Sequence, residues 1–426
     1  MTNSLKELYD DLQVAQSGQH SGAASAATED PFILKLSQLV LAHGVDVKAS
    51  DIHIEPSTSG ARIRYRIDGI LHEMLAVPQA TRDPLIRSIK VRANMVTDVV
   101  GRSRPQDARI DFTHGNRQLD LRLSSFPTLF GDVLAIRILD RTAPLLGMEQ
   151  VGFPPDTQAE FERLIRRPNG MILVTGPAGS GKTTTLYAAL NRLRSPNVKI
   201  VTLEDPVEYQ VDGIDQGQIN PSIGLTFASG LRAILRQDAN IILVGEIRDK
   251  ETAEIAIRAA LTGHLVFSTL HTRHSFGATT RLIDMGIEPH LILGSVTGIV
   301  AQRLVRMVCQ RCKAADPLGA KAFTRVWTQE TGAEPSAGLT DRLSRGKGCE
   351  VCNQTGYRGR MGIFELLLLS EELKQMILDR ATGQFYRRVV GSGKMRTMIR
   401  DGLEKASRGH TTVEEVLRVT GETEET

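Results

Sequence analysis

The chain has few aromatic residues, almost no excess of charge and no long apolar segment. Aromatic residues make up 4% of its 426 residues, and 52 basic against 49 acidic residues leave a formal net charge of +3. Groove-binding nucleic-acid proteins generally carry a basic excess, and single-strand binders also need aromatic faces on which bases stack. The bulk composition therefore disfavours a nucleic-acid-binding protein, and only a local basic lining would be compatible with one.

Membrane-spanning and secretory signals are also missing. No apolar run approaches the roughly 20 residues that cross a bilayer, and the stretch 291–300 is interrupted by glycine and polar residues. Residues 1–30 lack the basic start and apolar core of a signal peptide. They are polar, with a Ser/Gly/Ala-rich part, so we expect a flexible polar leader and a cytoplasmic protein.

Cysteine is scarce, and its placement is informative. All four cysteines lie in two Cys-x-x-Cys pairs separated by 36 residues, namely Cys309, Cys312, Cys349 and Cys352. Two such pairs in a cytosolic chain are typical of a tetrahedral zinc site, and a disulfide framework is improbable in that compartment. Free buried thiols are the alternative. We predict a structural Zn²⁺ site without catalysis, because four thiolates leave no open position on the ion.

The most informative segment that is present is residues 176–183, which read Gly-Pro-Ala-Gly-Ser-Gly-Lys-Thr. An apolar run, 171–174, precedes it, and apolar residues at helical spacing follow it. In this strand–loop–helix context, backbone N–H groups cradle phosphates, the lysine reaches the β and γ phosphates, and the hydroxyl that follows it holds Mg²⁺. We therefore predict a nucleoside triphosphate site, which the family resemblance given below specifies as an ATP site. Its predicted binding residues are Gly176, Gly179, Ser180, Gly181, Lys182, Thr183 and Thr184.

The pattern of apolar runs predicts an α/β protein. Between about 146 and 305, short apolar strands at 171–175, 199–203, 241–244 and 264–268 alternate with helices, as in a doubly wound nucleotide-binding core. Before it, a helix at 32–43 and strands at 51–55, 62–67, 119–123 and 133–139 predict a separate α/β domain over 31–145.

Acidic residues follow two of the predicted core strands. Glu246 comes after strand 241–244, where a carboxylate can hold Mg²⁺ directly or through water; the alternative is a helix cap or a surface charge. Glu204, Asp205 and Glu208 follow the predicted strand 199–203, at the end of a sheet where loops open onto the ligand crevice. A solvated acidic turn is the alternative there.

Two histidines flank the strand over 265–268. A lone histidine beside apolar residues is more often structural than catalytic. His264 and His271 bracket one strand of a nucleotide-binding fold, and there a histidine can donate to the γ-phosphate or couple its loss to movement.

Several motifs together resemble the ATPase family of type II secretion and type IV pilus systems, over roughly residues 30–420. They are Ser50 to Glu55, Arg64 to Gly69, the glycine loop, Glu204 to Glu208, Leu231 to Asp238, Val244 to Asp249, Thr262 to His264 and His271-Thr272. The resemblance implies a RecA-like P-loop NTPase core after a small PAS-like α/β domain, then a zinc-binding insertion and a helical C-terminal region. The expected domains are 1–30, 31–145, 146–305, 306–360 and 361–426.

The family also implies roles for individual residues. Lys182 and Thr183 would bind phosphate and Mg²⁺, and Glu246 would be the Walker B acid. Glu208 would activate the attacking water, with Glu204 as the second choice.

Other implied roles fall on one histidine and two arginines. His271 would sense the γ-phosphate. Arg122 and Arg137, from the first domain, would neutralise charge on the phosphates. Considered without the family, two arginines on strands are more often surface charges.

The resemblance further implies a homo-hexamer whose ATP lies between the core and the first domain. It implies peripheral association with the inner membrane through a polytopic platform protein and assembly factors. Three positions depart from the usual family pattern: Ala108, Asp238-Ala239-Asn240 and Arg273. We also expect no additional docking domain within the first thirty residues, which leaves recruitment to the membrane open.

The proposed activity is ATP hydrolysis that drives assembly of a pilus or pseudopilus. The alternatives are a RecA-like nucleic-acid translocase and a nucleotide-binding scaffold without turnover. The choice between type II secretion and a type IV pilus system is open at this point.

Overall fold

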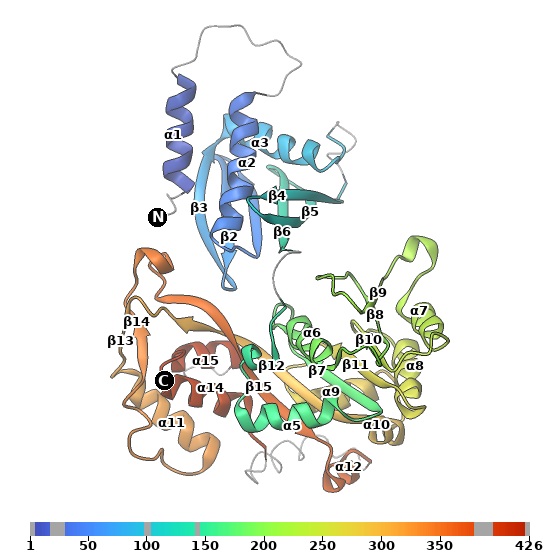
Figure 1. The fold of residues 1–426 in the computed structure, drawn as a ribbon. Coiled ribbons are helices and arrows are strands. Elements are labelled where there is room, and N and C mark those ends of the chain that lie inside the picture. Colours follow the sequence, from blue (N-terminus) through green and yellow to red (C-terminus); the bar gives the residue numbers. More distant parts are fainter. Residues whose placement is uncertain (1–4, 18–29, 98–103, 141–144, 379–394, 422–426) are drawn as a thin grey trace. The chain divides into compact units, whose positions relative to one another are not determined.

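The computed structural model describes residues 5–17, 30–97, 104–140, 145–378 and 395–421. The chain forms two compact units, Met1–Ala143 and Pro144–Thr426, and each is described by itself (Figure 1).

The first unit is built on a six-stranded antiparallel sheet in the order β3-β2-β1-β6-β5-β4. Its strands alternate between a buried and a solvent-facing side: Ile52 and Ile54 belong to one core cluster with residues of three helices, whereas Asp51 lies on the opposite face. The elements are α2 (Pro31–Asp46), β1 (Asp51–Ser57), β2 (Gly60–Ile67), β3 (Ile70–Pro78), α3 (Gln79–Arg92), β4 (Gln106–His114), β5 (Arg117–Thr128) and β6 (Gly131–Asp140).

A further helix, α1 (Leu5–Ser17), occupies part of the segment for which we expected a flexible leader. Leu5 and Tyr9 are buried in the same cluster as α2, and Leu12 packs against it. These residues repeat at helical spacing and give α1 one apolar side. We expected a flexible leader because residues 18–29, which lie outside the described residues, are rich in Ser, Gly and Ala. That composition does not extend to residues 5–17.

The second unit contains a seven-stranded sheet in the order β15-β12-β7-β11-β10-β8-β9. All neighbouring strands are parallel except β15, which runs antiparallel to β12. The four strands expected in the core are confirmed as β7 (Gly170–Thr175), β8 (Ile200–Glu204), β10 (Ile241–Val244) and β11 (Leu265–Leu270), and β9 is Asp215–Gln218.

Helices cover both faces of this sheet, as the doubly wound pattern predicted. Along β7, Met171 and Leu173 enter one core cluster and Ile172 and Val174 enter another, because successive side chains of a strand point to opposite faces. The helices are α4 (Met148–Val151), α5 (Pro155–Ile165), α6 (Lys182–Leu193), α7 (Phe227–Ile234), α8 (Lys250–Leu261), α9 (Ser275–Asp284) and α10 (Pro289–Ser295), with the 3₁₀ turn η2 (Pro221–Ile223).

Strands β12 (Val296–Val308) and β15 (Tyr357–Leu368) cross two of the expected boundaries. The core sheet therefore does not end at 305, and the region after 360 begins with a strand. That expectation was wrong because the apolar residues of 361–367 gain their partner, β12, only in the folded sheet. The cysteine-bearing segment is an insertion between these two strands.

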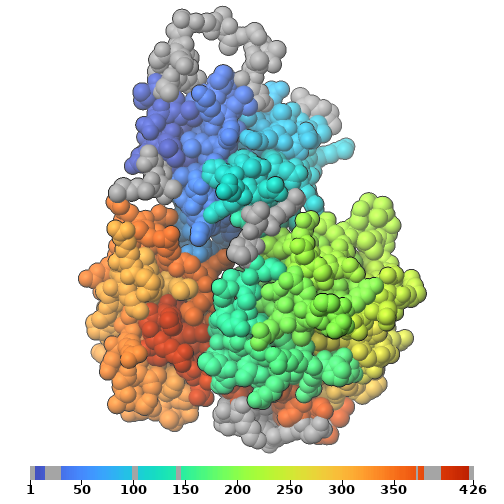
Figure 2. Space-filling model, in the orientation of Figure 1, coloured from blue at the N-terminus to red at the C-terminus, as the bar shows by residue number. Residues whose placement is uncertain are grey.

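The insertion and the last two helices, α14 (Met398–Ser407) and α15 (Val413–Thr420), lie side by side on the surface of the second unit (Figure 2). A cluster that includes Phe323, Leu343 and Leu403 joins them. The elements of the insertion are β13 (Lys313–Ala315), α11 (Gly319–Thr331), β14 (Ser344–Gly346) and η3 (Glu350–Cys352). Helix α12 (Glu371–Leu378) packs instead against α10 in the core of the sheet. Among the described residues, no helix combines the length and apolar character of a membrane span.

Candidate nucleotide site and cysteine cluster

The glycine loop connects the end of β7 to the start of α6. Gly176 and Gly181 have φ values of 153° and 87°, which residues with a Cβ rarely adopt. Gly181 is also the N-cap of α6, so the loop ends at a helix N-terminus with free N–H groups and positive potential. The geometry is that of an anion-binding loop.

Lys182 folds back into this loop. Its Nζ atom donates hydrogen bonds to the backbone oxygens of Gly176, at 2.8 Å, and Pro177, at 3.0 Å. Burial lowers the pKa of Lys182 to about 8, against the opposing influence of Glu246 and Glu208. The charged form of an ammonium group that burial has desolvated in this way is stabilised when an anionic ligand approaches.

Glu246 and His271 meet at the carboxyl edge of the sheet. Each follows a parallel strand, β10 or β11, and the Nε2 atom of His271 lies 3.2 Å from Oε2 of Glu246. The other carboxylate oxygen accepts a hydrogen bond from Arg248. Burial favours a higher pKa, but Arg248 and His271 outweigh it and hold the pKa of Glu246 below its usual value. The carboxylate is therefore ionised and suited to a cation.

His264 lies at the opposite, amino end of β11. Its Nδ1 atom is 3.0 Å from the backbone oxygen of Ala259, at the end of α8. Of the two histidines that flank this strand, only His271 is near the loop carboxylates, and the contact of His264 is a structural one.

Glu204 is enclosed in the core, where it is 4% exposed. Its carboxylate accepts hydrogen bonds from the hydroxyls of Tyr187, at 2.5 Å, and Thr202, at 2.6 Å. Burial raises the pKa of Glu204 despite these bonds and a further one from Gln216. Glu208, by contrast, is half-buried and close enough to influence the pKa of Lys182.

Arg122 and Arg137 lie directly opposite each other on β5 and β6. Arg109 is opposite Arg122 on β4, and Asp51 is opposite Arg137 on β1. Asp51 lies 3.2 Å from the Nε atom of Arg137. Asp120 lies 3.7 Å from the Nε atom of Arg122. Each of the two arginines therefore has a carboxylate beside it, which offsets the repulsion between like charges in opposed positions.

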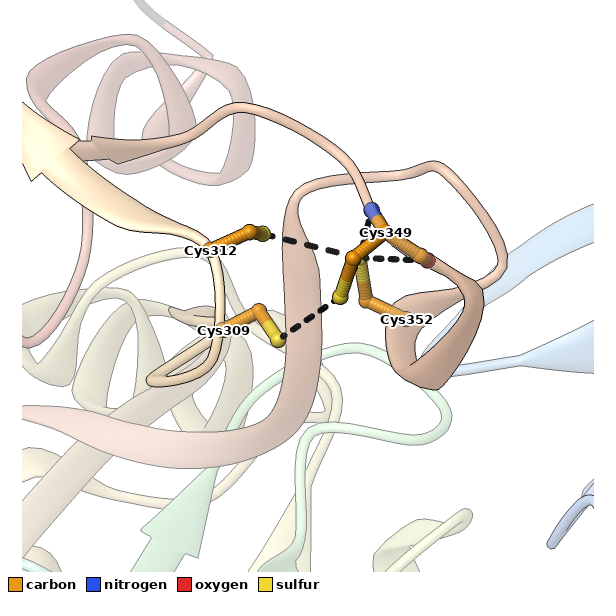
Figure 3. Close-up of side chains that lie close together, drawn as sticks. All are labelled: Cys309, Cys312, Cys349 and Cys352. Carbon is orange, nitrogen blue, oxygen red and sulfur yellow. Dashed lines mark hydrogen bonds between the residues drawn. The ribbon is translucent and has the colours of Figure 1, made fainter. Parts of the chain in front are cut away.

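The four cysteines come together from the two ends of the insertion, with their sulfurs directed toward one another (Figure 3). All four Sγ atoms lie within 4.8 Å of one another. The separations are 3.9 Å for Cys309–Cys349, 3.8 Å for Cys312–Cys352 and 3.6 Å for Cys349–Cys352. A tetrahedral zinc with Zn–S bonds of about 2.3 Å places sulfurs about 3.8 Å apart, so the cluster fits this ion.

The family model for type II/IV secretion system proteins matches residues 26–418 of the chain. The chain belongs to this family. It is 46% identical over 394 residues to the "Type II secretion system ATPase E" of Vibrio cholerae, which covers 92% of this chain and 76% of that protein. The type II secretion system protein E of Dickeya dadantii is also 46% identical over 394 residues, covering 92% of this chain and 77% of that protein.

Solved structures agree with the fold. The pilus retraction motor PilT with bound ADP matches with a TM-score of 0.60 and 25% identity, over 89% of this chain and 95% of that chain. The Legionella pneumophila ATPase DotB matches with a TM-score of 0.67 over 94% and 98% of the two chains, at 21% identity. This type II/IV secretion system family member is accordingly an ATP hydrolase with a P-loop NTPase fold.

Sequence reasoning missed two buried polar residues of this secretion ATPase on the strand pair β12–β15. Gln302 contacts the glycine loop and α6. Oε1 of Glu365 accepts hydrogen bonds from the backbone N, at 3.0 Å, and the hydroxyl of Ser275, which begins α9 just after the His271 loop. The available signal was a glutamine and a glutamate beside apolar residues, at 299–301 and 366–368.

Proposed function

We propose that this chain is a cytoplasmic motor that couples ATP hydrolysis to assembly of a pseudopilus or pilus in a type II secretion or type IV pilus-like system. The observation that carries the proposal is the convergence of Lys182, Glu246 and His271 beside a phosphate-type loop. Membership of the secretion family supports the assembly role over other uses of the same loop.

In the proposed site, N–H groups of the glycine loop and Lys182 hold the phosphates. Thr183 and the ionised Glu246 would hold Mg²⁺, which neutralises charge on the β- and γ-phosphate oxygens. His271, which is hydrogen-bonded to Glu246, is proposed to donate a hydrogen bond to the γ-phosphate and to respond when this phosphate leaves.

Glu208 is the proposed group that accepts a proton from the attacking water. Glu204 is less suited to this role, because its two oxygens are occupied by Tyr187 and Thr202 in the core. Glu204 is better suited to a structural role, in which it anchors the segment that carries Glu208.

Arg122 and Arg137 of the first unit are the proposed arginines that neutralise the charge spreading over the γ-phosphoryl group. Their opposed positions place the two arginines side by side on adjacent strands of the sheet. Arginines in this role are worth about 10³–10⁵ in rate in other NTPases.

Cys309, Cys312, Cys349 and Cys352 are the proposed ligands of a structural Zn²⁺. The sulfur separations support tetrahedral coordination. Backbone N–H groups of Cys349 and Gly356 donate to the Cys352 sulfur at 3.2 and 3.3 Å, which favours a thiolate. The ion would join the ends of β12 and β15 and take no part in catalysis.

The proposed assembly is a homo-hexamer held at the inner membrane by a polytopic platform protein and its assembly factors. The formal net charge of +3 supports a protein partner over nucleic acid. In cells that lack their own copy, the Lys182→Ala chain would reach normal levels yet fail to support secretion or fibre assembly. Full function of that variant, or hydrolysis stimulated by DNA with a steep salt dependence, would contradict the proposal.

A further inference from the structure

The side chain of Gln302 is a buried link between the two ends of the phosphate loop. The residue is 1% exposed. Its Nε2 atom donates to the backbone oxygen of Ser180 at 2.7 Å, and its Oε1 atom accepts from the hydroxyl of Thr185 at 2.8 Å. One amide thus contacts the loop before Lys182 and the helix after it.

The backbone of β12 brings Gln302 to this place. Strand β12 pairs in parallel with β7 up to Ala301 opposite Thr175, the last residue before the loop. The loop then packs closely on β12: a Cβ added to Gly176 would lie 2.6 Å from the Gln302 backbone oxygen, and one added to Gly181 would lie 3.0 Å from its Nε2 atom. These glycines are required for packing against Gln302 as well as for their φ values.

The bond to Ser180 fixes the orientation of a peptide group in the loop. In a trans peptide the C=O and the following N–H point in opposite directions. Because the Ser180 carbonyl points to Gln302, the N–H of Gly181 points away from β12. A loop that binds phosphate through backbone N–H groups depends on this orientation.

The bond from Thr185 fixes the first turn of α6. It is buried and links residues 117 positions apart in the chain. Lys182 and Thr183 lie between the two points that Gln302 holds. The N–H groups at the start of the helix are therefore held in register with those of the loop.

We propose that Gln302 is a positioning residue for the nucleotide phosphates, acting through Ser180 and Thr185. The inference rests on the phosphate site proposed above. Without this amide, the loop loses the orientation of one peptide plane and its fixed spacing to α6. Nucleotide is then bound more weakly because the ordering of the loop must accompany binding.

The test compares Gln302→Met, which keeps the length of the side chain, with Thr297→Val. Thr297 lies on the same strand and donates a hydrogen bond to the Met171 backbone oxygen of β7 at 3.1 Å, at the end of β7 remote from the loop. Each variant loses side-chain hydrogen bonds of β12, but only Gln302→Met loses one to the loop. We expect about tenfold weaker binding of fluorescent ADP and a similar rise in KM for ATP in Gln302→Met, with Thr297→Val at wild-type values.

A second variant protects the test against misfolding of Gln302→Met. Thr185→Val removes only the bond at α6, and we expect it to weaken ADP binding severalfold. In the double variant the two losses should be less than additive, since each removes part of one linkage.

Unchanged ADP affinity in Gln302→Met, a loss no larger than that of Thr297→Val, or fully additive losses in the double variant would overturn the inference. A wild-type chain that binds no ADP would overturn the phosphate site itself, so the two failures are distinguishable.

Discussion

The Nε2 atom of His271 lies 3.2 Å from the Oε2 atom of Glu246, although 25 residues separate them in the chain. The contact arises because β10 and β11 are adjacent parallel strands that end at the same edge of the sheet. The proposed γ-phosphate sensor is thereby joined to the proposed metal-holding carboxylate.

Replacing His271 by alanine is expected to lower kcat for ATP hydrolysis about tenfold to a hundredfold and to change ADP affinity less than threefold, because ADP has no γ-phosphate. His264→Ala is the matched control, since His264 lies at the other end of the same strand. Phosphate release and ADP titration check this. Equal losses of kcat in both variants would contradict a sensor role.

Glu204, at the end of β8, and Glu208, in the segment after it, are expected to behave differently. Glu208→Gln should lower kcat at least a hundredfold, as loss of a general base does. Glu204→Gln should stay within about threefold of wild type. The free energy of unfolding of Glu204→Gln should stay within about 1 kcal/mol of the wild-type value at neutral pH. The substitution weakens hydrogen bonds to the carboxylate, but it also removes the cost of burying its charge.

The pH dependence of stability gives a second readout for Glu204. A raised folded-state pKa means that the ionised carboxylate destabilises the fold above the unfolded pKa and that this cost disappears below it. Relative to wild type, Glu204→Gln should therefore lose stability as the pH falls. A large loss of kcat in Glu204→Gln with normal kcat in Glu208→Gln would contradict this account and assign activation of the water to Glu204.

The parts of the site that were predictable from the sequence are those set by local pattern. The glycine loop, Glu246 and His271 each follow a short apolar strand, and a parallel sheet brings such strand ends together. Their proximity therefore followed once the strands were assigned. Arg122 and Arg137 also lie on strands that were expected, at 119–123 and 133–139, and those strands are neighbours in the sheet.

Contacts between distant segments were not predictable. Gln302 meets Thr185 only because β12 is inserted beside β7, and β15 joins the sheet as an antiparallel edge strand. Only the family resemblance ranked Glu208 above Glu204 in the sequence. Their difference in burial depends on Tyr187, on another element, and no local pattern carries that information.

Removal of the cysteine ligands tests the proposed zinc. Purified wild-type chain should contain about one zinc ion per chain, and Cys309→Ser should lose it together with several degrees of Tm, because a structural zinc contributes directly to folding. Gln310→Ala, a neighbouring exposed residue, should keep both. Metal analysis and thermal melts check this, and a metal-free wild type with an equal Tm would contradict it.

Nucleotide affinity should depend on pH through Lys182. Burial lowers the pKa of its ammonium to about 8, so the free protein loses this charge above pH 8, while bound phosphate retains it. ADP binding should therefore weaken by up to about tenfold per pH unit above 8. Lys182→Arg remains charged throughout and should show weaker but nearly pH-independent binding between pH 7 and 9. Parallel pH profiles for the two proteins would contradict this account.

The most direct test of the central claim is steady-state phosphate release measured against protein concentration, with the oligomeric state followed by sedimentation. We expect Mg²⁺-dependent hydrolysis that rises as hexamers form, is abolished by Lys182→Ala and falls at least a hundredfold in Arg122→Ala and Arg137→Ala. Arg62→Ala, an exposed arginine of the same unit paired with Glu55, should remain active. Robust turnover by a strict monomer, or by the Lys182→Ala chain, would contradict the account.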